Sequence, residues 1–268
     1  MHKIHLITEL SDSQTARQPD IQTKRQPDIQ TRDNRDFRIL FNLVVVKIYS
    51  MCFSAGASFT GAAIITAVGA ATVYRTPSGP KKLFSAVPLI FGIQQASEGV
   101  IWSILENGGS DQVLNMATIM FLIAALLIWP VMMPLSIWKM EEDPSRKKWI
   151  LPFLIAGITI AVYYLVCMIL IKSTAVIEGN HIRYAGQFPK VLMIPVFVIY
   201  VFATITPLFI SSVKRVRPMG VLMLLSVVVS GIFYKVFVTS VWCFFAALIS
   251  IVIYWILEEE RKVELRLA

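Results

Sequence analysis

The sequence predicts an all-α, polytopic integral membrane protein, and three observations support this prediction. Hydrophobic residues make up 56% of the 268 residues and charged residues only 16%, whereas about a quarter of the residues of a soluble domain are charged. Apolar stretches of about 17 to 25 residues, long enough to cross a hydrocarbon core about 30 Å thick, recur along the chain. The charged residues lie almost entirely in the gaps between these stretches.

Seven transmembrane helices are expected after the first fifty residues. In the third of them Pro130 follows Trp129, and Pro134 lies about one turn further on. Because proline has no backbone N–H group, this helix should be kinked, and the carbonyl groups freed there need partners from neighbouring helices. The approximate bounds of the seven helices are 55–74, 84–105, 113–137, 150–171, 191–211, 219–235 and 240–257.

The distribution of basic residues predicts the orientation of these helices. Thirteen Lys and Arg residues lie in alternate loops and the C-terminal tail, against four on the opposite side. The positive-inside rule therefore places the C-terminus in the cytoplasm and Met51, at the N-terminal end of the membrane domain, outside. Tryptophans lie near several predicted helix ends, as in an interfacial aromatic belt: Trp138, Trp149 and Trp255 at inner ends, and Trp102 and Trp242 at outer ends.

Residues 1–50 differ from the rest of the chain. They are mostly polar and contain a near-exact tandem repeat at 17–23 and 25–31. A segment of this composition cannot bury enough apolar surface to fold. We therefore expect a disordered or untranslated extension, with translation starting at Met51, and a seven-helix membrane domain over residues 51–268.

Charge and cysteine usage exclude some classes of function. The net charge of +8 comes from Lys and Arg residues in short loops, where they set orientation and meet anionic lipid head groups, so the expected partner is the lipid bilayer and not nucleic acid. Cys52, Cys167 and Cys243 form no CxxC pair. No motif with a known catalytic mechanism is present, so the sequence specifies neither an enzyme activity nor a cofactor.

The second predicted helix carries an unusual polar stripe. Gln94, Gln95, Glu98 and Trp102 fall within an arc of about 100°. A carboxylate near the middle of a span costs several kcal/mol unless it faces the bundle interior, is protonated or finds hydrogen-bond donors. Two interpretations remain open: a hydrogen-bonded strut between helices, or a site for a substrate, proton or ion.

Small and weakly polar residues form stripes on the first and last predicted helices. Such stripes allow close packing of helices in lipid, and they make these two helices expected neighbours. The stripes are Ser54, Ser58, Gly61, Gly69 and Thr72 on the first helix and Ser240, Cys243, Ala247, Ser250 and Tyr254 on the last.

Chemically capable residues gather on the predicted outer side and suggest one outward-facing pocket. Cys52 and Cys243 would be near enough for a disulfide or a shared metal, with His181 as a further metal ligand. The alternative is that the two thiols are unrelated and behave as small hydrophobic groups. The candidate residues are Cys52, Gln94, Gln95, Glu98, Trp102, His181, Tyr184, Ser240 and Cys243, with His181 and Tyr184 in the outer loop 172–190.

Five sequence motifs carry a family resemblance. They are Met51-Cys-Phe-Ser-Ala55 followed by Ala57-Ser-Phe59, the string from Phe91 to Gly99 with Trp102, His181-Ile-Arg-Tyr184, Ser211-Ser212, and Ser240-Val-Trp-Cys-Phe-Phe-Ala-Ala247. Together they resemble an uncharacterised family of bacterial multi-span membrane proteins, over essentially all of residues 51–268. The resemblance implies the start at Met51, a bacterial inner-membrane location, and motif status for Cys52, Gln95, Glu98, His181, Tyr184, Trp242 and Cys243. It implies no activity.

Three functions follow as hypotheses. The first is binding or transport of a small ligand that enters from the outer face, with Glu98 and the glutamines as its polar centre. The second is a membrane redox or metal-binding protein that uses Cys52, Cys243 and His181. The third is a structural or sensory helical bundle without small-molecule chemistry. The first is favoured over the second.

Overall fold

The structure is a computed structural model that describes residues 54–179, 181–185, 190–233 and 249–258. All of these belong to the second of two compact units of the chain, Val45–Ala268. Four helices are long and apolar enough to cross a membrane, which supports the predicted helical membrane class. They are Ala55–Arg75, Asp111–Met140, Pro144–Leu170 and Val191–Ile210.

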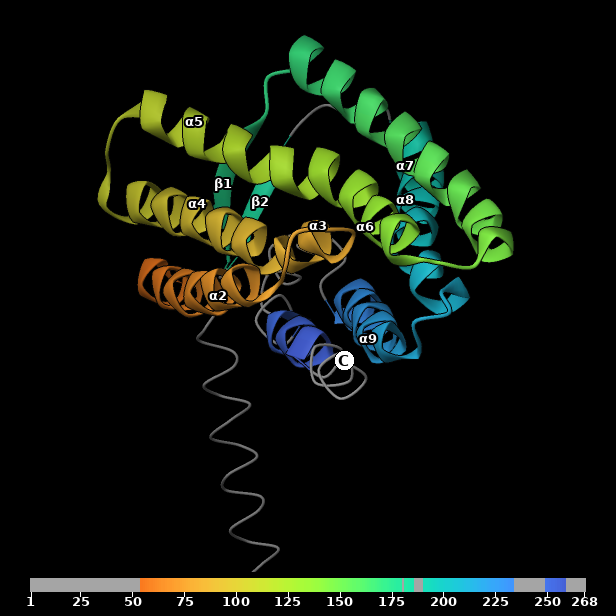
Figure 1. Ribbon diagram of the computed structural model, residues 1–268. Helices are drawn as coiled ribbons and strands as arrows, with labels where there is room; N and C mark the ends of the chain where they lie inside the picture. The colour runs from red at the N-terminus through yellow and green to blue at the C-terminus, as the bar shows by residue number, and fades with distance from the viewer. Residues whose placement is uncertain (1–53, 180, 186–189, 234–248, 259–268) are drawn as a thin grey trace, which may run out of the picture. The chain divides into compact units, whose positions relative to one another are not determined.

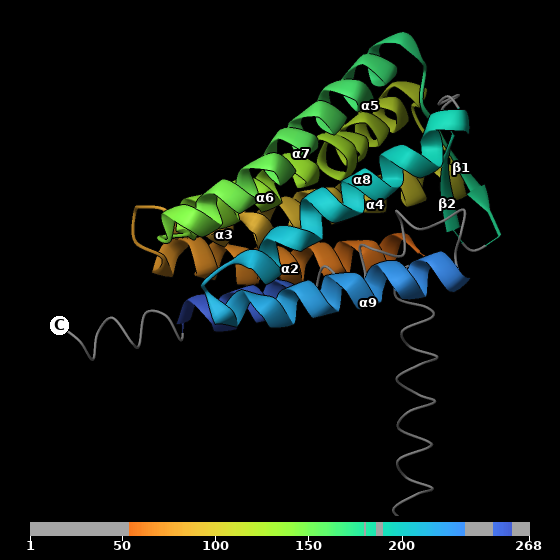
Figure 2. The same ribbon diagram turned by 90° about the vertical axis from the view of Figure 1, so that its right-hand side faces the viewer.

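Short connections join most of the described elements (Figures 1 and 2). In chain order the elements are α2 (Ala55–Arg75), α3 (Lys81–Ser85), α4 (Val87–Asn107), α5 (Asp111–Leu122), the π-helix η1 (Ile123–Ile128), α6 (Trp129–Met140), α7 (Pro144–Leu170), the strands β1 (Thr174–Glu178) and β2 (His181–Ala185), α8 (Lys190–Ile210), the 3-10 helix η2 (Lys214–Val216) and α9 (Arg217–Phe233). A last described helix covers Ile249–Glu258.

Three of the seven predicted spans are not among the four long apolar helices. The helix α4 has 21 residues, but Gln94, Gln95 and Glu98 lower its mean hydropathy. The helix α9 has 17 residues, and the last helix is described only from Ile249 to Glu258. The number of spans beyond four stays a prediction.

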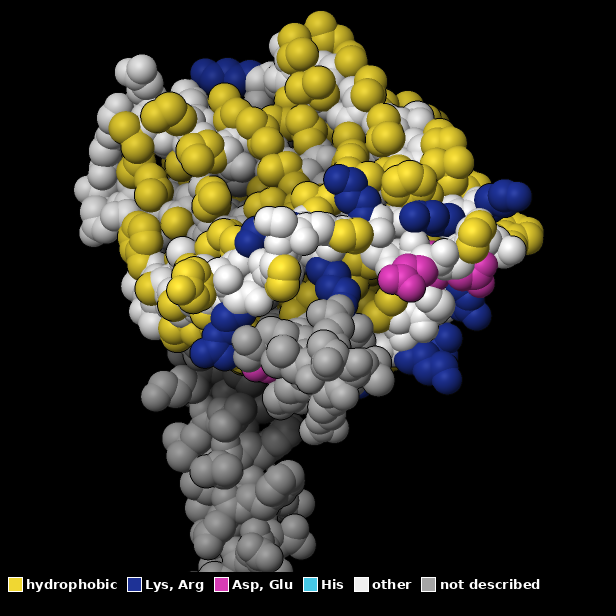
Figure 3. All heavy atoms as spheres, in the orientation of Figure 1, with side chains coloured by type: hydrophobic (Ala, Val, Ile, Leu, Met, Phe, Trp, Pro, Cys, Tyr) yellow, Lys and Arg dark blue, Asp and Glu magenta, His cyan; other side chains and the backbone are white. Residues whose placement is uncertain are grey.

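Large apolar side chains cover the outside of the helices that could cross a membrane. Ile155, Ile169 and Leu170 of α7 are 56%, 74% and 77% exposed. On α8, Ile194 and Phe202 are also more exposed than buried. Figure 3 shows one face of the molecule, on which apolar side chains dominate the upper part and most charged side chains lie below them. Apolar surface of this extent is typical of contact with lipid.

The helices α2 and α4 pack antiparallel at very short range. A Cβ atom on Gly69 would lie 2.7 Å from the backbone nitrogen of Leu89, and one on Gly92 would lie 2.2 Å from Thr66 Oγ1. Only glycine permits this approach at either position. The prediction that the first helix packs closely through small residues is confirmed. The buried residues of α2 are Ser58, Ala62, Ile65, Gly69 and Thr72.

In the third predicted helix, the α-helical hydrogen-bond pattern is interrupted by the π-helix η1 just before Pro130. The N–H group of Trp129 donates to the carbonyl of Ala124, five residues back. In this register the Ala125 carbonyl would pair with residue 130, which has no N–H group. The Tyr200 hydroxyl of α8 donates to that carbonyl at 2.8 Å. The prediction that a freed carbonyl finds a partner on a neighbouring helix is confirmed.

A second carbonyl of α6 that lacks a backbone partner lies in close contact with α7. Pro134 cannot donate to the carbonyl of Pro130, which leaves that oxygen exposed to a neighbour. A Cβ atom on Gly157 would lie 1.8 Å from the Pro130 oxygen, so α7 contacts this carbonyl through its backbone.

The segment between α7 and α8, which was predicted as an outer loop, contains two short strands. Residues Thr174–Glu178 and His181–Ala185 form an antiparallel hairpin, with Glu178 opposite His181. Gly179 adopts a φ of 62°, which favours glycine in the turn. The sequence carried the signal, because a Gly-Asn pair separates two short runs in which apolar and polar residues alternate.

Candidate functional site

The polar stripe of α4 is buried. Gln94 and Gln95 are each 4% exposed, and Glu98 is 0% exposed. Glu98 therefore faces the interior of the described bundle and not lipid, as the cost of a carboxylate in hydrocarbon predicts. The Gln95 Nε2–H group donates to Glu98 Oε2 at 3.3 Å.

Gln94 connects α4 to the interrupted helix. The Trp129 Nε1–H group donates to Gln94 Oε1 at 2.7 Å. The Trp129 ring also stacks on Phe91, with ring centroids 4.0 Å apart. This part of the stripe is a strut between α4 and α6, so the strut interpretation holds for Gln94.

Trp102 lies one helical turn beyond Glu98, and its indole is not exposed at the surface. It is 2% exposed, whereas Trp149 and Trp255 are 70% and 49% exposed. Trp149 and Trp255 are thus exposed, as an interfacial position requires, whereas Trp102 is buried beneath the β-hairpin and α5. The level of these tryptophans in a membrane stays a prediction. Trp102 packs in a cluster with Ile101, Ala117, Phe121, Leu122, Ala125, Ala175 and Ile182.

Two buried hydrogen-bond donors lie at this end of α2 and α4. Trp102 Nε1 and Ser58 Oγ are buried, and neither has a hydrogen-bond partner within the described part of the chain. A Cβ atom on Gly99 would lie 2.9 Å from the Phe59 ring, which places Ser58 at nearly the same level as Trp102. Buried donors are usually satisfied, so these two are candidates to bind a polar partner.

The hairpin brings one of its two candidate residues into this region. The Tyr184 ring stacks on Phe121 with centroids 4.4 Å apart, and Tyr184 packs against the cluster that contains Trp102. Side chains alternate along a strand, so His181 lies on the opposite face of the hairpin from Tyr184 and Ile182. His181 is half-buried, and burial lowers its pKa.

The remaining predicted residues, Cys52, Ser240 and Cys243, lie outside the described residues. Their meeting with Glu98 is therefore a prediction only. Of the described elements, α2 and the last helix are neighbours, because Arg75 Nη1–H of α2 donates to the Tyr254 hydroxyl at 2.8 Å. Among the described residues, no group of three His, Cys, Asp or Glu side chains is placed to hold a metal ion.

A second buried carboxylate, Glu141, was not singled out by the sequence. It is 0% exposed and lies between α6 and α7. Its Oε2 accepts hydrogen bonds from the Ser211 hydroxyl at 3.0 Å and the Ser212 N–H group at 2.6 Å. Its Oε1 accepts from the Ser212 hydroxyl and from the Asp143 N–H group.

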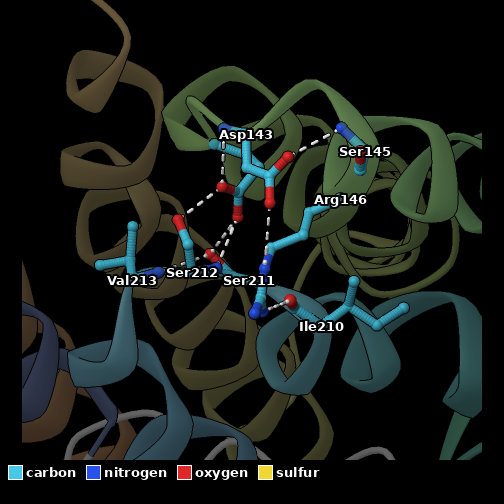
Figure 4. A network of polar contacts seen from close by, with 8 residues as sticks. Asp143, Ser145, Arg146, Ile210, Ser211, Ser212 and Val213 are labelled. Carbon is cyan, nitrogen blue, oxygen red and sulfur yellow. Dashed lines mark hydrogen bonds and ion pairs between the residues drawn. The ribbon is translucent and has the colours of Figure 1, made fainter.

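Figure 4 shows the network that joins the two connections, with Asp143 on one side and Ser211 and Ser212 on the other. Arg146 adds a further link, because its Nη1–H group donates to the Ile210 carbonyl at 2.6 Å. Burial raises the pKa of Glu141, but hydrogen bonds from Ser212, Asp143 and Ser211 lower it more, so its net pKa is below the ordinary value. Glu141 therefore joins α6 and α7 to the end of α8 as a carboxylate.

Comparison with known proteins leaves the activity open but identifies the family. No curated protein and no solved structure matches the chain. Residues 51–267 match the family of unknown function DUF6629. The match includes all described helices, both buried glutamates and the β-hairpin. The chain therefore belongs to the DUF6629 family of unknown function.

Proposed function

We propose that the protein is a seven-span protein of a bacterial cytoplasmic membrane that binds, and in one form of the hypothesis transports, a small polar ligand from the outer face. Its N-terminal end lies outside and its C-terminus in the cytoplasm. Four long apolar helices and the exposed apolar side chains on their surfaces support the membrane location. The excess of basic residues on one side supports the orientation.

Reporter fusions test the topology. Reporters placed after Lys82, Arg146 and Arg217 should give a cytoplasmic signal, and one inserted near Gly108 should give an external signal. The C-terminus supplies a further cytoplasmic position. A cytoplasmic signal near Gly108 would contradict the orientation.

The observation that supports ligand binding is the polar region at the predicted outer end of α4. It combines a fully buried carboxylate, Glu98, with two buried donors, Trp102 Nε1 and Ser58 Oγ, that lack partners within the described residues. Ionisable groups inside a bundle are typical of ligand and ion paths. The carboxylate favours a cationic or hydrogen-bond-donating group, and the two donors favour an acceptor. A small zwitterion or amide meets both requirements.

A thermal-stability screen of purified full-length protein tests this site. The probes are amino acids, betaines, simple amides and primary amines at millimolar concentration. At least one probe should raise the unfolding temperature of the wild type, and the shift should disappear in Glu98→Gln and shrink in Trp102→Phe. Glu142→Gln is the matched control, because Glu142 is exposed in the connection after α6.

The screen also distinguishes a ligand site at Glu98 from a hydrogen-bonded strut between helices. If Glu98→Gln folds normally and retains the full shift, the carboxylate does not contact the ligand. If no probe shifts the wild type, the ligand class proposed for this region is wrong.

A further inference from the structure

The β-hairpin covers one end of α4 and α5. Ala175 and Ile182 are 5% and 1% exposed and pack in the cluster that contains Trp102. The ring of Tyr184 stacks on Phe121 of α5. Figure 2 shows the two strands at one end of the helices. The hairpin therefore lies between the indole of Trp102 and the solvent.

The two faces of the hairpin differ in chemistry. The face toward α4 and α5 carries the apolar side chains of Ala175 and Ile182. The opposite face carries Glu178 and Arg183, which form an ion pair and whose side chains are 54% and 42% exposed. A sheet with one apolar, buried face and one charged, exposed face separates a core from water.

Few side chains attach the hairpin to the helices. A two-stranded hairpin is only marginally stable by itself in water, so its position depends on these contacts. Ile177 lies on the same face as Ala175 and is already 38% exposed. The helix α4, in contrast, packs against α2 along much of its length, as the close approaches at Gly92 and Gly99 show. A segment with few buried contacts can open locally while the rest of the fold stays intact.

We infer that the hairpin is a lid, which opens as a unit and admits a small solute to the Trp102 end of α4. This inference rests on the proposed ligand site, because it assigns the route to that site. Opening exposes Trp102 Nε1, a donor without a partner within the described residues, and Glu98 lies one helical turn deeper. Closing over a bound ligand excludes water from these polar groups.

Cysteine labelling of the purified full-length protein in neutral detergent tests the lid. The natural cysteines Cys52, Cys167 and Cys243 are first replaced by serine. Ala117→Cys then introduces a thiol beneath the hairpin, because Ala117 is 6% exposed and packs in the same cluster. Ser136→Cys is the matched control, since Ser136 is also buried but lies in α6, whose buried apolar residues belong to a separate cluster. The reagent is methanethiosulfonate ethyltrimethylammonium, whose permanent charge keeps it in water.

The thiol of Ala117→Cys should react, while that of Ser136→Cys should stay unmodified over the same period. Adding Ile182→Ala should raise the rate at residue 117 by at least about 10-fold, since removing a buried isoleucine side chain shifts a closed–open equilibrium by more than that factor. Arg183→Gln changes only the exposed face of the hairpin and should alter the rate by less than about twofold.

Three results would overturn the inference: no labelling at residue 117, an unchanged rate in Ile182→Ala, or equal rates at residues 117 and 136, which would indicate unfolding of the whole protein. If the cysteine-free protein does not fold, hydrogen exchange of the wild type replaces the labelling. The amides of β1 and β2 should then exchange faster than those of α4 and α5, and exchange of all four elements together would refute the lid. Both measurements are made without ligand. A failed ligand screen therefore does not change their outcome, and a hairpin that stays closed leaves the screen of the Glu98 site unaffected.

Discussion

The two buried glutamates of this protein lie in contrasting surroundings. Glu141 is enclosed by two connections, whose hydroxyl and backbone N–H groups donate to both of its oxygens. Glu98 lies within a helix, next to Gln95, at the same end as two buried donors that lack described partners. A completed set of donors is typical of a structural lock, whereas unsatisfied donors beside a carboxylate are typical of a binding site.

The largest expected effect comes from reversing the charge at residue 98. Glu98→Lys places an ammonium group where a fully buried carboxylate lies. An uncompensated buried charge costs about 3 to 5 kcal/mol, which is a large fraction of the roughly 5 to 15 kcal/mol by which most proteins are stable. We expect no monodisperse protein on size-exclusion chromatography in detergent. Glu98→Gln should remain monodisperse, because the amide keeps the shape and can still accept a hydrogen bond from Gln95.

Removal of the second carboxylate should be costly but tolerated. Glu141→Ala leaves Ser211 and two backbone N–H groups without their acceptor, and we expect a loss of about 3 kcal/mol in the free energy of unfolding. Chemical denaturation in detergent measures this loss. Glu142→Ala removes an exposed carboxylate and should change the stability by less than about 0.5 kcal/mol. Equal effects of Glu141→Gln and Glu98→Gln would contradict the contrast between the two sites.

The sequence predicted four helices that are long and apolar enough to cross a membrane, but it predicted few of the contacts between helices. Long apolar runs, the prolines at 130 and 134, and the glycines of the first helix each follow from local rules, and the structure confirms their consequences. Glu98 was also recognisable, because a carboxylate inside an apolar run has few permitted environments.

Glu141 shows why the rest could not be predicted. In sequence it resembles any acidic residue of a charged loop, and its donors Ser211 and Ser212 come from a connection 70 residues away. Only the packing of α6, α7 and α8 brings these groups together. The burial of Trp102 was hard to predict for a similar reason, because it depends on a hairpin within the segment that was predicted as a loop.

The pH dependence of stability should distinguish the Glu141 network. Its folded pKa is lowered, so the unfolded state takes up a proton more readily than the folded state. The stabilisation is therefore present above the unfolded pKa of about 4.3 and is lost as the pH falls through the lower folded pKa. We expect the wild type to lose stability below about pH 4.3 more steeply than Glu141→Gln. Parallel curves for the two proteins would contradict an ionised Glu141.

The smallest expected effect comes from removing the Tyr200 hydroxyl, which supports the interrupted helix. Tyr200→Phe removes the hydroxyl that donates to the Ala125 carbonyl, which Pro130 leaves without a backbone partner. A single neutral hydrogen bond contributes about 1 kcal/mol, so the unfolding temperature should fall by about 2 to 4 °C. Tyr74→Phe is the matched control, because Tyr74 is 90% exposed and should give no measurable shift. Ligand-induced shifts at the Glu98 site should persist in Tyr200→Phe, since the Tyr200 hydroxyl donates to the interrupted helix at Ala125. A lost ligand response in Tyr200→Phe would show that the interruption at Pro130 belongs to the binding region and not to its support.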